Sequence, residues 1–162
     1  MSARLDAAPP AQGADLIARA LGAAALATLA MIHVIDLPAT LGPAPLVGVG
    51  YFGIIAAAIL VGGMMIARSH WLVWAAAGGL AASAMGGYVL TRALAGGFLG
   101  DHGDVGNWHC PLGIAALSVE SVIILLVLLV VLGAWQARIH AASVAGQNRP
   151  AARRAPEYSR PG

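Results

Sequence analysis

The sequence predicts an all-α protein, a bundle of four transmembrane helices, and three observations lead to this prediction. Of the 162 residues, 59% are apolar and only 10% are charged. Soluble domains carry about 25% charged residues, so the apolar excess must face a medium other than water. Four apolar stretches have about 20 residues or slightly more, which is enough to cross a hydrocarbon core of about 30 Å. None alternates as a barrel strand does, so helices are the expected state in lipid.

The four apolar stretches differ in the charges that they contain. The first holds Arg19 near its start and His33 near its end, the fourth holds Glu120, and the second and third hold no charged residue. We predict the four helices at residues 16–35, 46–67, 71–91 and 112–135.

Polar segments flank a predicted membrane domain of residues 15–140. Residues 1–14 and 141–162 are rich in Ala, Pro, Gly and Arg and have no apolar period that could build a core. We therefore expect two disordered tails, of which the C-terminal one is rich in arginine.

The arginines predict the orientation of the chain. Eight of the nine lie before or at the start of the first span, between the second and third spans, or after the fourth. Only Arg92 falls on the opposite side. Basic residues gather on the cytoplasmic side of membrane proteins, so we expect a multi-pass protein of the cell (inner) membrane with both termini in the cytoplasm.

Small residues recur at four-residue spacing in the second and third spans. Gly79, Ser83 and Gly87 follow this spacing in the third span, and Gly53 and Ala57 do so in the second. Such stripes let helix backbones approach closely in lipid, so we expect the second and third helices to pack through them. The alternative is that the stripe faces outward and forms the interface of a homodimer.

Four polar residues form a candidate site at the outer side of the membrane. His33 and Asp36 share one helix face, Arg92 ends the third span, and Glu120 lies about two turns inside the fourth. A carboxylate in the hydrocarbon region costs about 2.5–3.5 kcal/mol on insertion scales, which makes Glu120 a functional candidate. We expect His33, or else Arg92, to be its partner. Alternatively, a neutral Glu120 bonds a backbone carbonyl or a serine and serves only helix packing.

Several side chains of the outer loop are of types that bind metals. Nitrogen, oxygen and sulfur donors suit copper or zinc, but no His-x-x-x-His or paired-cysteine spacing is present. Only His33 is embedded in the membrane, whereas haem ligation by two histidines needs two such residues. We therefore predict no cofactor, with haem and copper as alternatives. The weak metal candidates are His102, Asp104, His109 and Cys110.

One stretch of the chain has a pattern of residues that is similar to one in known proteins. Its residues are Gly106-Asn107-Trp108, Pro111-Leu112-Gly113 and Val119-Glu120. This pattern resembles one in small uncharacterised four-helix membrane proteins of high-GC Gram-positive bacteria. The resemblance implies the architecture of a bacterial cell-membrane protein and no named activity. The present chain has Cys110 where that pattern has an acidic residue before the proline.

The function predicted from these features is a structural or accessory subunit of a membrane complex rather than an enzyme. No phosphate-binding loop or Gly-x-Ser-x-Gly motif is present in the sequence. The expected partners are the lipid bilayer and either further copies of the chain or a larger membrane complex, and no nucleic acid. The alternative is a membrane redox or proton- or cation-handling module with its site around His33 and Glu120.

Overall fold

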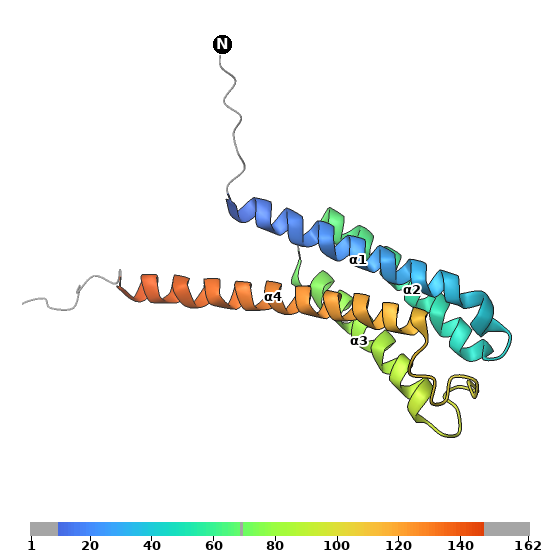
Figure 1. The fold of residues 1–162 in the computed structure, drawn as a ribbon. Coiled ribbons are helices and arrows are strands. Elements are labelled where there is room, and N and C mark those ends of the chain that lie inside the picture. Colours follow the sequence, from blue (N-terminus) through green and yellow to red (C-terminus); the bar gives the residue numbers. More distant parts are fainter. Residues whose placement is uncertain (1–9, 69, 148–162) are drawn as a thin grey trace, which may run out of the picture. The chain divides into compact units, whose positions relative to one another are not determined.

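The computed structural model describes residues 10–68 and 70–147, which form four α-helices (Figure 1). The helices are α1 (Pro10–Leu41), α2 (Pro45–Ala67), α3 (Trp71–Ala93) and α4 (Pro111–Gln147). The described residues contain no strand, only an isolated bridge between Phe98 and Asp101. All four helices are long and apolar enough to cross a membrane. The prediction of an all-α protein with four membrane-spanning helices is therefore confirmed.

The first and last helices, α1 and α4, extend well beyond the predicted spans. α1 begins at Pro10, within the predicted N-terminal tail, and continues through Pro38 to Leu41. α4 continues to Gln147, within the predicted C-terminal tail. Alanine-rich sequence has high helix propensity, so a helix can continue past the apolar segment that spans the membrane. The rest of the two predicted tails, residues 1–9 and 148–162, lies outside the described residues.

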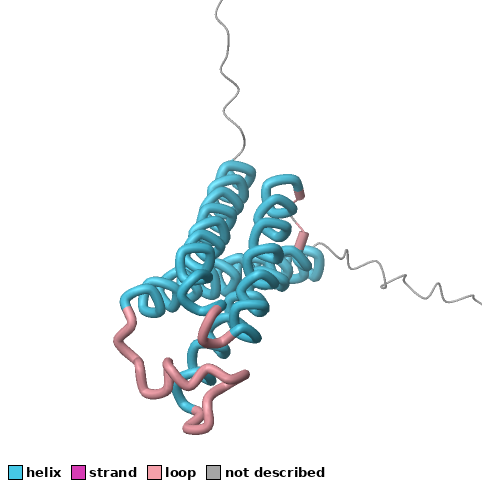
Figure 2. The backbone as a smooth tube through the Cα atoms, turned by 90° about the vertical axis from the view of Figure 1, so that its right-hand side faces the viewer, coloured by secondary structure: helices cyan, strands magenta, loops and turns pink. Residues whose placement is uncertain are grey.

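The chain divides into two compact units. The first ends at Leu128 and the second begins at Leu129, so α4 runs through both. Within the first unit α1 packs along α2, and α2 also contacts α3. The α1–α2 turn and the loop of residues 94–110 lie at the same end of this unit (Figures 1 and 2). The largest side chains that are fully buried are Leu26, Leu29, Met65, Glu120 and Ile123.

Arg19 ties the start of α1 to the end of α2. Its Nε donates to the carbonyl oxygen of Met65 at 2.7 Å, and its Nη2 donates to the carbonyl oxygen of Ile66. Asp15, one turn earlier, lies 3.6 Å from Nη1. The last carbonyls of a helix have no partner within the helix and carry partial negative charge. The guanidinium therefore satisfies two of these groups in α2.

Most of the small residues through which we predict α2 and α3 to pack have open surroundings in the described chain. A Cβ atom built on Gly53, Gly79 or Gly87 would meet no atom within 4 Å, and Ser83 is exposed. The buried residues of α3 include Val73, Trp74, Ala77, Ala81 and Ala84 instead. Four-residue spacing identifies a helix face, but it does not tell which face meets a neighbour. Ala57, the fifth residue of that prediction, is half-buried.

Candidate functional site

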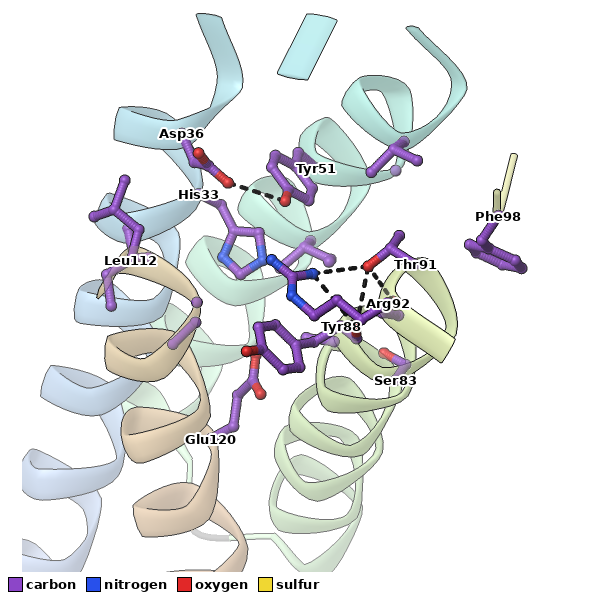
Figure 3. Close-up of a pocket in the computed structure, with 18 of the residues that line it drawn as sticks. His33, Asp36, Tyr51, Ser83, Tyr88, Thr91, Arg92, Phe98, Leu112 and Glu120 are labelled. Carbon is purple, nitrogen blue, oxygen red and sulfur yellow. Dashed lines mark hydrogen bonds between the residues drawn. The ribbon is translucent and has the colours of Figure 1, made fainter. Parts of the chain in front are cut away.

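A cavity of about 130 Å³ lies between the helices of the first unit (Figure 3). Its walls come from all four helices and from the loop that joins α3 to α4. Cavities of about 150 Å³ hold a molecule the size of benzene, so this one has room for a small ligand. The four residues predicted as a polar site all line it, namely His33, Asp36, Arg92 and Glu120.

Glu120 is the most deeply buried of these polar residues, with 1% of its surface exposed. α4 begins at Pro111, and its buried face continues through Ala116, Glu120 and Ile123, which holds the carboxyl group against the cavity. Its Oε2 atom has no hydrogen-bond partner among the described residues. The expected pairing with His33 or Arg92 is absent from the part of the chain that the structure describes. Arg92 bonds Asn107 and Asp104, and His33 bonds Leu29 through Nδ1.

His33 is buried in α1 and has a defined tautomer. Its Nδ1 lies 2.9 Å from the carbonyl oxygen of Leu29. A carbonyl oxygen only accepts hydrogen bonds, so Nδ1 carries the proton, and in the neutral ring Nε2 presents a lone pair. The imidazole meets the ring of Tyr51 edge-on, with centroids 4.8 Å apart. The Tyr51 hydroxyl in turn donates to Oδ2 of Asp36 at 3.0 Å, which links α1 to α2.

Arg92 is buried at the end of α3 and its guanidinium is almost fully bonded. Nε donates to the carbonyl oxygen of Asn107 at 2.8 Å, and Nη1 donates to Oγ1 of Thr91 at 2.8 Å. Nη2 lies 3.1 Å from Oδ2 of Asp104. The guanidinium also stacks 3.7 Å above the Tyr88 ring centroid. Arg92 therefore fastens the loop to α3, and Asp104 balances its charge.

Gly113 allows α4 to approach this cluster. A Cβ atom at that position would collide with the ring of Tyr88 and lie 3.4 Å from Nη2 of Arg92. Tyr88 itself donates from its hydroxyl to the carbonyl oxygen of Trp108 at 2.8 Å, and the two rings meet at a steep angle. The Pro-Leu-Gly segment of the resemblance thus has a structural role, which is to let the first turn of α4 lie close to α3.

The weak metal candidates lie apart from the cavity. His102 and His109 are exposed, Cys110 is half-buried, and Asp104 pairs with Arg92. Residues 10–68 and 70–147 contain no group of three or more His, Cys, Asp or Glu side chains placed to hold a metal ion. The loop is instead organised by its acids, since Oδ1 of the buried Asp101 accepts from the Asp104 amide at 3.2 Å.

Comparison with protein-family models, curated proteins and solved structures found no match. The interpretation of the site therefore rests on its own geometry.

Sequence reasoning missed several polar residues of the cavity wall. Tyr51, Tyr88 and Thr91 line it together with Ser83, which the sequence assigned to helix packing. A tyrosine within an apolar span could have been found, because a buried hydroxyl needs a hydrogen-bond partner. Thr91 gives no such signal, since a threonine in a helix usually bonds the preceding turn, as it does here with Gly87 and Tyr88.

Proposed function

We propose that this chain is a multi-pass membrane protein that binds a small cation, the proton included, at the carboxyl group of Glu120. The observation that carries the proposal is that Oε2 of Glu120 is buried beside a cavity and has no hydrogen-bond partner among the described residues. Burying a carboxylate in a membrane is costly, and a carboxyl group that served packing alone would recover this cost through an internal bond. A bound cation accounts for both the burial and the missing partner.

The charges around the cavity favour a cation over an anion. Arg92 is the basic side chain of the cavity wall, and Asp104 balances its charge. Asp36 adds a carboxylate whose Oδ2 accepts from Tyr51. A bound anion would need an uncompensated positive group, whereas Glu120 and the Nε2 lone pair of His33 both attract positive charge. Carboxyl and imidazole groups also exchange protons readily, which suits a proton as one of the cations.

The distribution of arginines supports the orientation that we propose with this function. In the proposed orientation both termini lie on the cytoplasmic side of the cell membrane, as the positive-inside rule predicts. Phe98 and Leu99 of the 94–110 loop line the cavity together with Arg92, the only arginine that lies on the opposite side by sequence. The cation site would therefore open near the outer face of the membrane.

Labelling with dicyclohexylcarbodiimide tests this function in liposomes that contain the full chain. This apolar reagent reacts with protonated carboxyl groups, so we expect mass spectrometry to find the adduct on Glu120. Labelling should fall as the pH is raised and also when a cation that occupies the site is added. Glu120→Gln should lose this adduct, whereas Ser118→Ala, a change at an exposed position two residues away, should keep it. Labelling of Glu120 at a rate that neither pH nor any cation alters would contradict the proposal.

A second candidate function is that of an accessory subunit, and the open glycine face of α2 and α3 favours it. No atom lies within 4 Å of a Cβ built on Gly53 or Gly79, so these positions are free to contact another membrane helix. We expect Gly79→Leu to abolish co-purification of any partner subunit while leaving carbodiimide labelling of Glu120 unchanged. Unchanged co-purification with Gly79→Leu would argue against a partner at this face.

A further inference from the structure

The geometry of the cavity points to a small primary ammonium ion, one that carries a short alkyl group, as its ligand. This inference rests on the proposed function and names the class of cation. It is carried by the hydrogen bonds of the cavity wall, in which nearly all donors are engaged within the protein and acceptors remain open.

The hydroxyl donors of the wall are all used internally. Tyr51 donates to Asp36 and Tyr88 donates to the carbonyl oxygen of Trp108. Ser83 donates to the carbonyl oxygen of Leu80 at 2.8 Å, and Thr91 donates to main-chain carbonyls one turn earlier. Each hydroxyl has a single hydrogen to give, so none of these groups is left to donate to a ligand.

The remaining donors of the wall are almost all committed. Nδ1 of His33 donates to Leu29. The Nε and Nη1 groups of Arg92 donate to Asn107 and Thr91, and Nη2 faces Asp104. A ligand that mainly accepts hydrogen bonds, such as a carboxylate or a phosphate, would therefore find few partners in this cavity.

Acceptors, in contrast, remain open. Oε2 of Glu120 has no partner in the described chain, and Nε2 of the neutral His33 ring carries a lone pair. These two acceptors come from α4 and α1, and both residues line the cavity (Figure 3). An ammonium group supplies three N–H donors and one positive charge. It would satisfy the orphan oxygen of Glu120 by a charge-assisted hydrogen bond, which is roughly twice as strong as a neutral one.

The rest of the wall sets the size and the polarity of the ligand. Ile32, Val47, Ile54, Ala84 and Ala116 provide apolar surface beside the two acceptors. This surface fits a short alkyl group, whereas a bare ammonium ion would leave it uncovered. The volume of about 130 Å³ is slightly smaller than that of cavities which hold benzene, so the ligand should have about six non-hydrogen atoms or fewer.

Ethylammonium chloride is the probe for this inference, and its binding to the full chain in mild detergent can be measured by isothermal titration calorimetry. We expect ethylammonium to bind the wild-type chain and the Ser118→Ala control equally well. Tetramethylammonium has the same charge and no N–H group, so it should bind roughly tenfold or more weakly. Glu120→Gln should weaken ethylammonium binding by a similar factor, because it removes the charge from the acceptor.

A second measurement needs no variant and therefore does not depend on how Glu120→Gln folds. In the unaltered chain, ethylammonium should slow carbodiimide labelling of Glu120 several-fold, and tetramethylammonium at the same concentration should not. Equal protection by the two ions would overturn the role of N–H donors. Protection by Na⁺ or K⁺ and not by ethylammonium would overturn the inference and leave the proposed function standing. Labelling that is indifferent to pH and to all of these cations would overturn both.

Discussion

Arg19 and Glu120 are both charged residues within apolar stretches, and the structure treats them differently. Arg19 bonds to the carbonyl oxygens of Met65 and Ile66 and lies near Asp15. Glu120 is more deeply buried, yet its Oε2 has no partner among the described residues. The Arg19 guanidinium donates to the last carbonyl oxygens of α2, whereas the Glu120 carboxyl group lines a cavity. The comparison teaches that a charge within a span indicates function when its polar atoms are left open.

The largest loss of stability is expected when Arg92 is replaced. Like Arg19, Arg92 has a guanidinium group that is hydrogen-bonded within the protein. Arg92→Ala removes the groups that hold Asn107, Thr91 and Asp104 and leaves their polar atoms without donors. Breaking a buried ion pair on one side costs about 3 kcal/mol or more, and because the Asp104 side chain is 32% exposed, we expect the low end of this range, about 3 kcal/mol. The free energy of unfolding, measured by titrating sodium dodecyl sulfate into mixed micelles, should fall by about this amount. Arg92→Lys should lose less, and a loss below about 1 kcal/mol for Arg92→Ala would show that the loop is not held through this residue.

A smaller loss is expected at Arg19. Arg19→Met keeps much of the side-chain volume but removes the donors to the carbonyl oxygens of Met65 and Ile66. Hydrogen bonds to charged groups contribute about 1.5–3 kcal/mol, and the half-exposed position of Asp15 makes its own contribution minor. The same micelle titration measures the change. If Arg19→Met were as stable as the wild type, water would replace the guanidinium without cost and the contrast with Glu120 would weaken.

The smallest change in stability is expected at Glu120 itself. Glu120→Gln preserves the shape of the side chain, and in the described structure it breaks no hydrogen bond of Oε2. Its free energy of unfolding should therefore lie within about 1 kcal/mol of the wild type, or above it, because a neutral amide is less costly to bury than a charge. Carbodiimide labelling should be lost in the same variant. A loss of 3 kcal/mol or more, roughly the cost of breaking a buried pair, would assign Glu120 to packing.

The sequence predicted the four helices and picked out the four polar residues that the cavity brings together. A polar residue in a long apolar stretch stands out without knowledge of the fold, which is why these residues could be named from the sequence. The bonding partners were not predictable in this way. Arg92 pairs with Asp104 because the loop between them turns back through Gly97 and Gly100, which both have positive φ angles. Such a path depends on backbone conformations that the glycines permit but do not specify.

The length of the helices and the choice of packing face were also beyond the sequence. Apolar content ends where the hydrocarbon ends, but backbone hydrogen bonding continues, so α1 and α4 extend into segments predicted as tails. The glycines of α3 were assigned to packing because they are small, whereas the buried face of α3 is built from alanines, Val73 and Trp74. Both kinds of residue allow close approach, and only the neighbouring helices decide between them.

The contact between Tyr88 and Trp108 gives the protein an optical label beside the cavity. Tyr88 lines the cavity, and its hydroxyl and ring both meet Trp108, with ring centroids 6.2 Å apart. Indole fluorescence depends on the polarity around the ring, and a tyrosine this close transfers its excitation to the tryptophan. With Trp71, Trp74 and Trp135 replaced by phenylalanine, the emission of Trp108 becomes a continuous signal of what enters the cavity, recorded without an attached dye.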